Sequence, residues 1–300
     1  MSEASLLRDL RQDLDDAGLR GSFLVRDLRT GTEVGIEPDL AYPTASLVKV
    51  PLAISIFDRI RTGELDGAEG ILVEPGRDTT LGVTGITKFR HPARISIEDL
   101  VYLSICLSDN VASEALFALA PPAQVAEAMR AAGVRGLTIR HSIRELSDTP
   151  ADRLRAADVH LAHVLAIGAG TAGRGHGIPQ LDVTRASSGS ARAFVDLLQA
   201  LWTPSPIDPG VAARVRALMA DNLMRQRLTP DFSSDSTLWS SKTGTLLNLR
   251  HEVGVVEHDD GQVFGVAALT ESQVAARAQP EAEALMGRVA RTLRDHLRGM

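Results

Sequence analysis

The chain has 300 residues, of which 44% are hydrophobic and 23% charged, and its net charge is -6. These values are typical of a soluble globular protein, and the length allows one large domain or two smaller ones. The mild negative charge, with arginines spread along the chain, gives no electrostatic case for a nucleic-acid or membrane partner. Cys106 is the single cysteine, so no intrachain disulfide can form.

The N-terminal segment and the apolar stretches bear on the location of the protein. The sequence "MSEASLLRDLRQDLDDAGLR" is charged and amphipathic, unlike a secretory signal. No stretch approaches the roughly 18 apolar residues of a membrane span. If Met1 is the native start, these features predict a cytoplasmic protein.

The first half of the chain predicts a helix, a hairpin and several further helices. Residues 3–18 carry leucines at helical spacing, and residues 21–38 read as two strands joined by a glycine-containing turn. A helix begins near Ser46, with Pro51 in its first two turns, where proline removes a hydrogen bond. Ser96 can cap the next helix. The remaining helical patterns span residues 96–107, 110–120, 122–133, 149–168, 187–202 and 209–226.

The pattern changes after residue 226 to short, valine-rich strands. Strands are predicted over residues 237–245, 251–258 and 262–269, with a turn signal at Asp259-Asp260-Gly261. An amphipathic helix over about 279–298 closes the chain. The simplest arrangement joins both ends of the chain in one antiparallel five-stranded sheet flanked by the terminal helices. We therefore predict an α/β domain of residues 1–44 and 208–300, with an inserted all-helical domain of residues 45–207.

Lysine is rare in this sequence, which directs attention to the few that are present. The chain has 29 arginines but only three lysines, Lys49, Lys88 and Lys242. An arginine side chain does not release its proton in a protein, whereas a lysine amine does so once burial or a nearby cation lowers its pKa. The lysines are therefore candidates for chemistry.

Two of these lysines belong to a set of three short motifs. The motifs are Ser46-Leu47-Val48-Lys49, then Ser108-Asp109-Asn110, then Lys242-Thr243-Gly244 followed by Thr245. They fall on a predicted helix start, an interhelix loop and a strand. Each is weak alone, but together and in this order they resemble the penicillin-recognising serine enzymes, which include class A β-lactamases and penicillin-binding proteins. The resemblance covers nearly the whole chain and implies the same split architecture, with the active site between the two domains.

The spacing of the first motif predicts nucleophilic catalysis. Positions three apart on a helix share a face, so the Ser46 hydroxyl and the Lys49 amine can meet. Burial and the Lys242 cation would lower the pKa of Lys49, which then acts as general base while Ser46 attacks a carbonyl and becomes an acyl-serine. General-base help of this kind contributes roughly 10²–10⁴ in rate.

The resemblance assigns roles to the other motif residues. The backbone N–H groups of Ser46 and Thr245 form the oxyanion hole, and Ser108 passes a proton to the leaving group. Asn110 holds the substrate amide and the Lys49 amine, whereas Asp109 is structural. Lys242 steadies Ser108. Lys242 and Thr243 bind the substrate carboxylate, as does Arg250 on the next strand. Gly244 and Thr245 also belong to the substrate-binding residues.

One departure limits the resemblance. Class A β-lactamases carry a Glu-x-x-Leu-Asn sequence after the second motif, and its glutamate activates the water that clears the acyl-enzyme. Here the comparable stretch holds only Glu145-Leu146, and Glu145 matches the less critical second carboxylate of that loop. The longer segment that follows contains His160, His163 and His176, for which we predict no metal or cofactor.

Three functions remain open. The first is a serine acyl hydrolase or acyl transferase acting on a carboxylate-bearing amide, ester or lactam, in antibiotic or secondary metabolism. The second is a true β-lactamase, which the missing glutamate and the missing export signal disfavour. The third is a catalytically inactive binding protein on the same fold, which the complete set of motifs disfavours.

Overall fold

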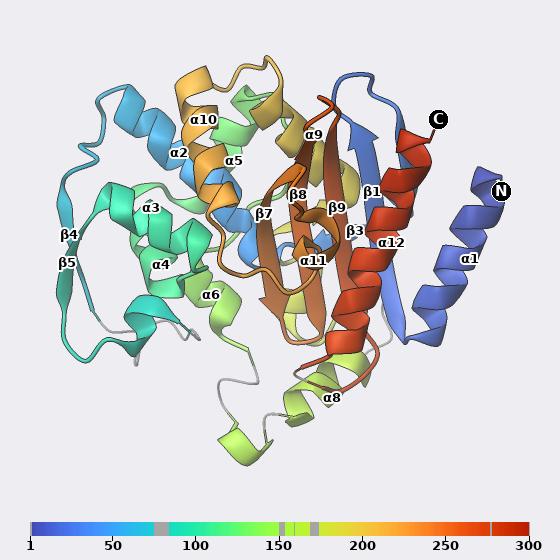
Figure 1. Ribbon diagram of the computed structural model, residues 1–300. Coiled ribbons are helices and arrows are strands. Elements are labelled where there is room, and N and C mark those ends of the chain that lie inside the picture. The colour runs from blue at the N-terminus through green and yellow to red at the C-terminus, as the bar shows by residue number, and fades with distance from the viewer. Residues whose placement is uncertain are drawn as a thin grey trace.

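The computed structural model describes residues 2–74, 84–149, 154–158, 160–168, 174–276 and 278–299. Its centre is an antiparallel five-stranded sheet, as predicted, in which the N-terminal hairpin pairs with the C-terminal strands (Figure 1). The strands, in their spatial order, are β2 (Glu33–Ile36), β1 (Leu19–Asp27), β9 (Val263–Ser272), β8 (Leu249–His258) and β7 (Thr237–Leu246).

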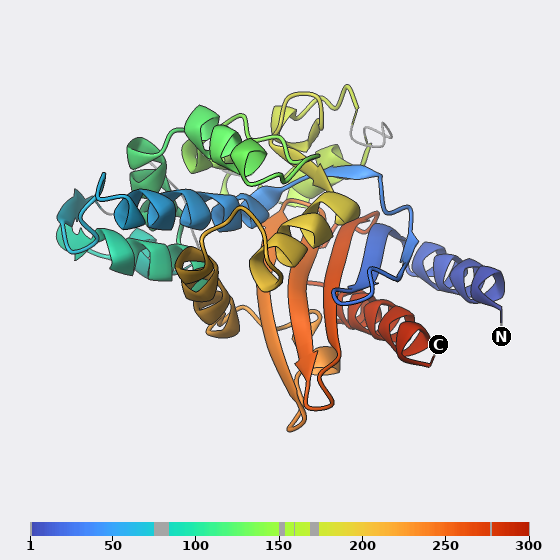
Figure 2. The same ribbon diagram turned by 90° about the horizontal axis from the view of Figure 1, so that it is seen from above.

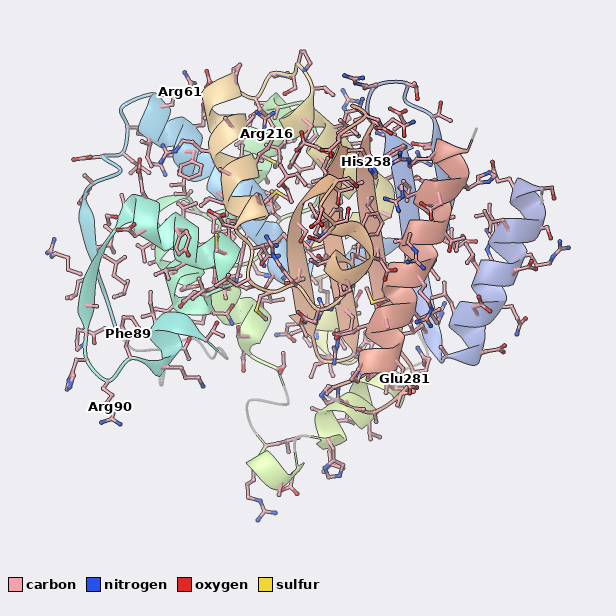
Figure 3. The ribbon with its side chains drawn as sticks, in the orientation of Figure 1. Arg61, Phe89, Arg90, Arg216, His258 and Glu281 are labelled. Carbon is pink, nitrogen blue, oxygen red and sulfur yellow. The ribbon has the colours of Figure 1, made fainter. Side chains whose placement is uncertain are left out.

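The terminal helices cover one face of this sheet. The helix α1 (Glu3–Asp16) begins at Ser2, whose side chain accepts a hydrogen bond from the Ser5 N–H, and its leucines pack on the sheet. The C-terminal helix α12 (Pro280–Arg298) and the single turn α11 (Thr229–Phe232) lie on the same face. His258, labelled in Figure 3, is the last residue of β8. Arg294, near the end of α12, contacts its ring, with 3.3 Å between Nη1 and Nε2.

The remaining helices pack on the other face and extend beyond the edge strand β7 (Figure 2). The side chains of β8 alternate between the two hydrophobic cores, with Val255 on the helical side and Val256 on the α12 side. The helices of this part are α2 (Lys49–Arg61), α3 (Ile97–Cys106), α4 (Asn110–Leu119), α5 (Pro122–Ala131), α6 (Ile143–Ser147), α8 (His160–Gly168), α9 (Ala191–Trp202) and α10 (Pro209–Ala220).

Several short elements were not predicted. Two small two-stranded sheets pair β3 (Ala41–Pro43) with β6 (Ser188–Ser190) and β4 (Gly70–Val73) with β5 (Ala93–Ser96). Short 3-10 helices also appear at η1 (Ala45–Val48), η2 (Gly85–Lys88), η3 (Ala156–Asp158) and η4 (Pro179–Leu181). The pair of β3 and β6 ties the chain just before Ser46 to a segment far along the sequence.

Several helix predictions need correction. The helix predicted over residues 209–226 ends at Ala220, and the one predicted over residues 187–202 begins at Ala191. The helix expected to begin near Ser46 is divided into η1 and α2, so that Pro51 is the third residue of α2. In the first turn its missing N–H has no intrahelical partner to lose, so the expected cost does not arise. The helix expected over residues 149–168 is shorter, since the described residues form only η3 and α8 there, and residues 150–153 and 159 lie outside the description.

No helix in the described ranges is both long and apolar enough to cross a membrane. Cys106 is fully buried in α3, and its thiol donates to the Leu218 carbonyl oxygen at 3.2 Å. This is the inert buried environment expected from its apolar neighbours.

Candidate active site

Ser46 lies in η1, a tight turn held against the edge strand β7. The residue before it, Ala45, has a φ of 46°, in the left-handed region where a residue with a side chain is strained. A Cβ atom at Gly244 of β7 would come within 3.1 Å of the Thr44 carbonyl oxygen. The glycine of the third motif therefore lets β7 approach the turn that carries Ser46.

Lys49 is the first residue of α2 and is completely buried. Its Nζ donates hydrogen bonds to the Ser108 carbonyl oxygen at 2.7 Å and to Asn110 Oδ1 at 2.8 Å, and lies 3.3 Å from Ser108 Oγ. Burial, and then the cation of Lys242, lower the pKa of Lys49 well below its usual value. A lowered pKa favours the neutral amine, whose free lone pair suits a general base.

Among the described residues, no hydrogen bond joins the Lys49 amine to the Ser46 hydroxyl. The amine is directed instead to the second motif, at Ser108, Asp109 and Asn110. Catalytic hydrogen bonds are often long in the absence of substrate and shorten in the reacting complex. The direct contact between Ser46 and Lys49 therefore stays a prediction.

The loop of the second motif is strained and firmly anchored. Ser108 has a φ of 56° between α3 and α4. The buried Asp109 carboxylate accepts hydrogen bonds from the Ala112 N–H at 2.8 Å and the Ile86 N–H at 2.6 Å. The second contact is possible because the neighbour of Ile86 is a glycine, since a Cβ at Gly85 would lie 1.9 Å from Asp109 Oδ2. Asp109 thus holds the loop in place.

Lys242 of β7 reaches the same serine as Lys49. Its buried Nζ donates to Ser108 Oγ at 3.0 Å and to the Thr243 carbonyl oxygen at 2.9 Å. Burial, and then the Arg227 cation, lower the pKa of Lys242 to about 7. The Ser108 hydroxyl therefore lies within hydrogen-bond distance of two amines, and this arrangement can carry a proton from one to the other.

The other residues of the motifs differ in their exposure. Thr243 is buried and lies opposite Glu252 in the sheet register, whereas Thr245, near the end of β7, is exposed. Ser46, Ser108 and Asn110 are partly exposed. η1, the loop before α4 and strand β7 thus bring the three motifs together, as the sequence predicted.

The Arg250 side chain makes its hydrogen bonds within the hairpin of β7 and β8. It is 4% exposed, and its Nη1 donates to the carbonyl oxygens of Leu247 at 2.6 Å and Leu249 at 2.8 Å. Its Nε lies 3.7 Å from Glu283 of α12. Burial, and then the Arg227 cation, lower the pKa of Arg250 to about 10. Its contact with a substrate carboxylate stays a prediction.

Arg227 is a candidate site residue that sequence reasoning missed. It is fully buried, yet its Nη2 donates to Thr245 Oγ1 at 2.6 Å, and its Nη1 binds the carbonyl oxygens of Gly244 and His251. Glu283 pairs with its Nε at 3.0 Å. No motif surrounds Arg227 in the sequence, and only the fold brings it to the exposed Thr245.

Glu145 has a structural role. Its carboxylate accepts a hydrogen bond from the Ser142 N–H at 3.0 Å, which completes a capping box at the start of α6. When Glu-x-x-Leu-Asn is aligned on Leu146, the glutamate position is Ile143 and the asparagine position is Ser147. Ile143 is 1% exposed and belongs to the hydrophobic core. On this alignment, Ile143, which has no basic group, stands at the position of the class A glutamate.

The three histidines of the long segment do not gather around a common point. His160 is exposed and lies 3.1 Å from the Ala157 carbonyl oxygen, and His163 is buried in α8. Both ring nitrogens of His176 are engaged, one with the Ala166 carbonyl oxygen and one with the Ile178 N–H. Within the part of the chain that the structure describes, no three side chains of metal-binding type are grouped.

The chain as a whole is similar to known proteins. Residues 5–297 match the model of the β-lactamase enzyme family. The chain is 63% identical, over 99% of both sequences, to a protein of Streptomyces cacaoi named β-lactamase regulatory protein BlaB.

Solved structures share the fold at low sequence identity. A β-lactamase from Chitinophaga pinensis has a TM-score of 0.77 and 18% identity, over 98% of this chain and 99% of that one. A mutant of PBP-A, in an acyl-enzyme complex with penicillin G, has a TM-score of 0.75 and 16% identity, over 99% of this chain and 97% of that one.

Proposed function

Because the chain belongs to the β-lactamase enzyme family, we propose that it is a serine acyl-transfer protein whose nucleophile is Ser46. Its substrate is a small amide, ester or lactam that carries a carboxylate. The observation that carries the proposal is the pair of buried lysines, Lys49 and Lys242, on either side of the Ser108 hydroxyl. Two cations would repel each other there, so this arrangement favours one neutral amine as base and one charged amine that orients Ser108.

Acylation follows from this assignment. The neutral Lys49 amine takes the proton of Ser46 as the serine oxygen attacks the substrate carbonyl. The N–H groups of Ser46 and Thr245 bind the developing oxyanion, and one such donor contributes about 3–4 kcal/mol at the transition state. The proton then passes from Lys49 through Ser108 to the leaving group, and Lys242 keeps Ser108 oriented.

The substrate carboxylate binds beside Thr245. The charged Lys242 and the Thr245 hydroxyl are the direct partners, together with Thr243. Arg227 orients the Thr245 hydroxyl through their 2.6 Å hydrogen bond and adds positive potential from beneath the strand.

Release of the acyl group is slow in this proposal. A water must be held against the acyl carbonyl and activated by a base, and Ile143 supplies none. Bulky acyl groups from penicillins exclude water from the Ser46 ester, whereas small acyl groups admit it. Penicillins are therefore expected to give a burst followed by a low steady rate, and small esters a higher steady rate.

A second candidate function is recognition without turnover, as part of regulation. The relative of Streptomyces cacaoi carries the name of a regulatory protein, and an acyl-enzyme that persists suits a sensor better than a catalyst. Ile143 at the glutamate position favours this function over a true β-lactamase.

Intact-protein mass spectrometry separates these functions. The protein is incubated with a fluorescent penicillin, a boronate and a panel of small esters, and the adduct mass is followed over time. A persistent penicilloyl adduct supports slow release, and rapid return to the free mass with penicillin consumed supports a β-lactamase. No adduct with any probe contradicts the acyl-transfer proposal.

Arg227→Gln is expected to raise KM for a carboxylate-bearing ester at least tenfold and to leave the matching neutral ester nearly unchanged. The physical reason is the loss of a charged group that orients Thr245. Steady-state kinetics on the ester pair measure the effect. Arg250→Ala is the companion variant, and the sequence-based hypothesis expects the same selective rise in KM. Equal losses on both esters in either variant would indicate a structural role for that arginine.

The pH dependence of acylation reports the charge of Lys242. With a pKa of about 7, Lys242 is charged below that pH and loses its charge as the pH rises, so acylation by carboxylate-bearing substrates should decline above about pH 7. Lys242→Arg keeps the charge at all these pH values and should move the alkaline decline upward. An unchanged alkaline decline in this variant would show that another group titrates.

A further inference from the structure

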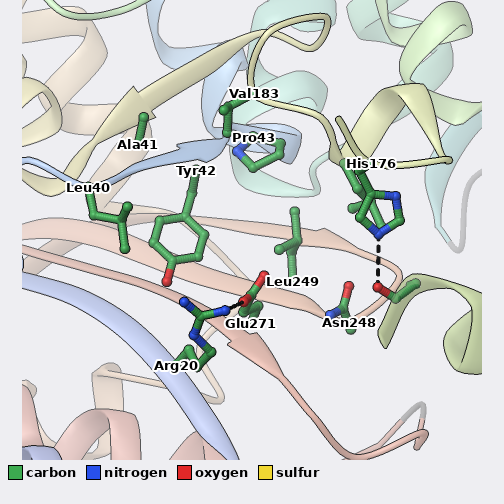
Figure 4. Close-up of a pocket in the computed structure, with 12 residues that line it drawn as sticks. Arg20, Leu40, Ala41, Tyr42, Pro43, His176, Val183, Asn248, Leu249 and Glu271 are labelled. Carbon is green, nitrogen blue, oxygen red and sulfur yellow. Dashed lines mark hydrogen bonds and ion pairs between the residues drawn. The ribbon is translucent and has the colours of Figure 1, made fainter. Parts of the chain in front are cut away.

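A hollow lies beside strand β3, between the sheet and the segment around α8 (Figure 4). The space between its atoms is about 390 Å³ when open solvent is counted, and the enclosed part is much smaller. None of the residues of the three motifs lines it. Strand β3 and the turn between β7 and β8 form its walls, and its enclosed part is narrow, so it suits a small molecule.

Asn248, in the turn between β7 and β8, supplies an unsatisfied acceptor. Its Nδ2 donates to the Ser272 carbonyl oxygen at 3.1 Å, which fixes the orientation of the amide. The side chain is buried, and its Oδ1 has no hydrogen-bond partner among the described residues. This oxygen points into the hollow (Figure 4). A buried acceptor without a donor is costly, so a donor group is favoured there.

The sheet side of the hollow, on which Asn248 also lies, offers one negative and one positive group on neighbouring strands. Glu271 of β9 and Arg20 of β1 form an ion pair, with 3.2 Å between Oε1 and Nη1. Glu271 is largely buried, while Arg20 is half-exposed at the opening. The Tyr42 ring stands beside this pair, and its hydroxyl is directed toward Arg20 (Figure 4). The guanidinium has further N–H groups for an anion.

The remaining polar side chain, His176, is not available for a ligand. Its two ring nitrogens are engaged with the Ala166 carbonyl oxygen and the Ile178 N–H, each at 2.9 Å. His176 therefore closes the hollow. A ligand can meet hydrogen-bond acceptors at one end, on Asn248 and Glu271, and donors at the other, on Arg20 and Tyr42.

We propose that this hollow binds a small zwitterionic α-amino acid, separately from the acyl-transfer site. Its ammonium donates to Asn248 Oδ1 and the Glu271 carboxylate, and its carboxylate accepts from Arg20 and the Tyr42 hydroxyl. A zwitterion adds no net charge to a site that already holds one cation and one anion, whereas a simple cation or anion would. Pro43 and Leu249, which also line the hollow, favour an apolar side chain.

Isothermal titration of the whole chain with glycine and with the two enantiomers of alanine tests the proposal. We expect saturable binding, and affinity at least tenfold weaker in Arg20→Gln and in Glu271→Gln, each checked by thermal unfolding for an intact fold. Asn248→Leu is a third variant with the same expectation. Ser46→Ala, outside the hollow, should bind as the parent does.

Probes that carry half of the zwitterion sharpen the test. Methylammonium and acetate should each bind at least tenfold more weakly than glycine. Several outcomes would overturn the proposal: no saturable binding of any amino acid, equal affinity for methylammonium and glycine, unchanged affinity in the folded Arg20 and Glu271 variants, or loss of binding in Ser46→Ala. The last outcome would place the amino acid in the acyl-transfer site, and the first would leave the hollow to water.

Discussion

Lys49→Arg should lose acylation as fully as Lys49→Ala, by roughly 10²–10⁴ in rate. Arginine keeps the positive charge but does not act as a base, because its guanidinium stays protonated. Lys49 is fully buried among the acceptors of the second motif, where its pKa is well below the usual value. These surroundings support the role of general base that we propose for Lys49.

The acylation rate with a fluorescent penicillin, measured by stopped flow, is the readout. Lys88→Arg is the matched control, because Lys88 is exposed and is the third lysine of the chain. Since arginine is larger than lysine, thermal unfolding must show that the Lys49 variants are folded, and Lys49→Met serves as a variant of similar size. Retention of most of the parent rate by Lys49→Arg would show that the site needs only a positive charge.

Ile143→Glu should speed the release of the penicilloyl group by about 10² or more, the range of general-base assistance. The alignment on Leu146 places this side chain where class A enzymes carry the glutamate that activates water. Burying an ionised carboxylate in the core costs more stability than the about 1–3 kcal/mol typical of a neutral polar group. Adding Ser147→Asn restores the second polar position of the loop motif.

Release is measured by trapping the penicilloyl adduct, removing free penicillin and following the adduct mass. Ile143→Gln is the control, because it has the shape of glutamate without its basicity. Equal release rates for the glutamate and glutamine variants would contradict the assignment of the loop. Rapid turnover of a cephalosporin by the parent chain, abolished by Glu145→Gln, would instead identify Glu145 as the base and the protein as a β-lactamase.

The large elements of the fold were predictable because they repeat a pattern over many residues. The sheet strands alternate buried and exposed positions or run as long apolar stretches, and α12 shows a helical stripe. Strands β3 and β6 have three residues each. Such segments are too short to show a period, and their pairing depends on residues far apart in the sequence, so they could not be predicted.

The candidate site divides in a similar way. Ser46, Ser108 and Lys242 belong to motifs with fixed local spacing, so the sequence located them. Arg227 has no motif, and its proximity to Thr245 depends on how the segment before β7 packs under the sheet. Arg250 lies next to Thr245 in the register, as its sequence position suggested, but register does not determine where a long side chain points.

Peptide mapping after labelling tests most directly whether Ser46 is the nucleophile. The protein is acylated with a fluorescent penicillin or a small active ester, digested, and sequenced by tandem mass spectrometry. The account predicts a single adduct on Ser46, absent from Ser46→Ala and still formed, more slowly, in Ser108→Ala. An adduct on Ser108 or on any other residue, or undiminished labelling of Ser46→Ala, would contradict it.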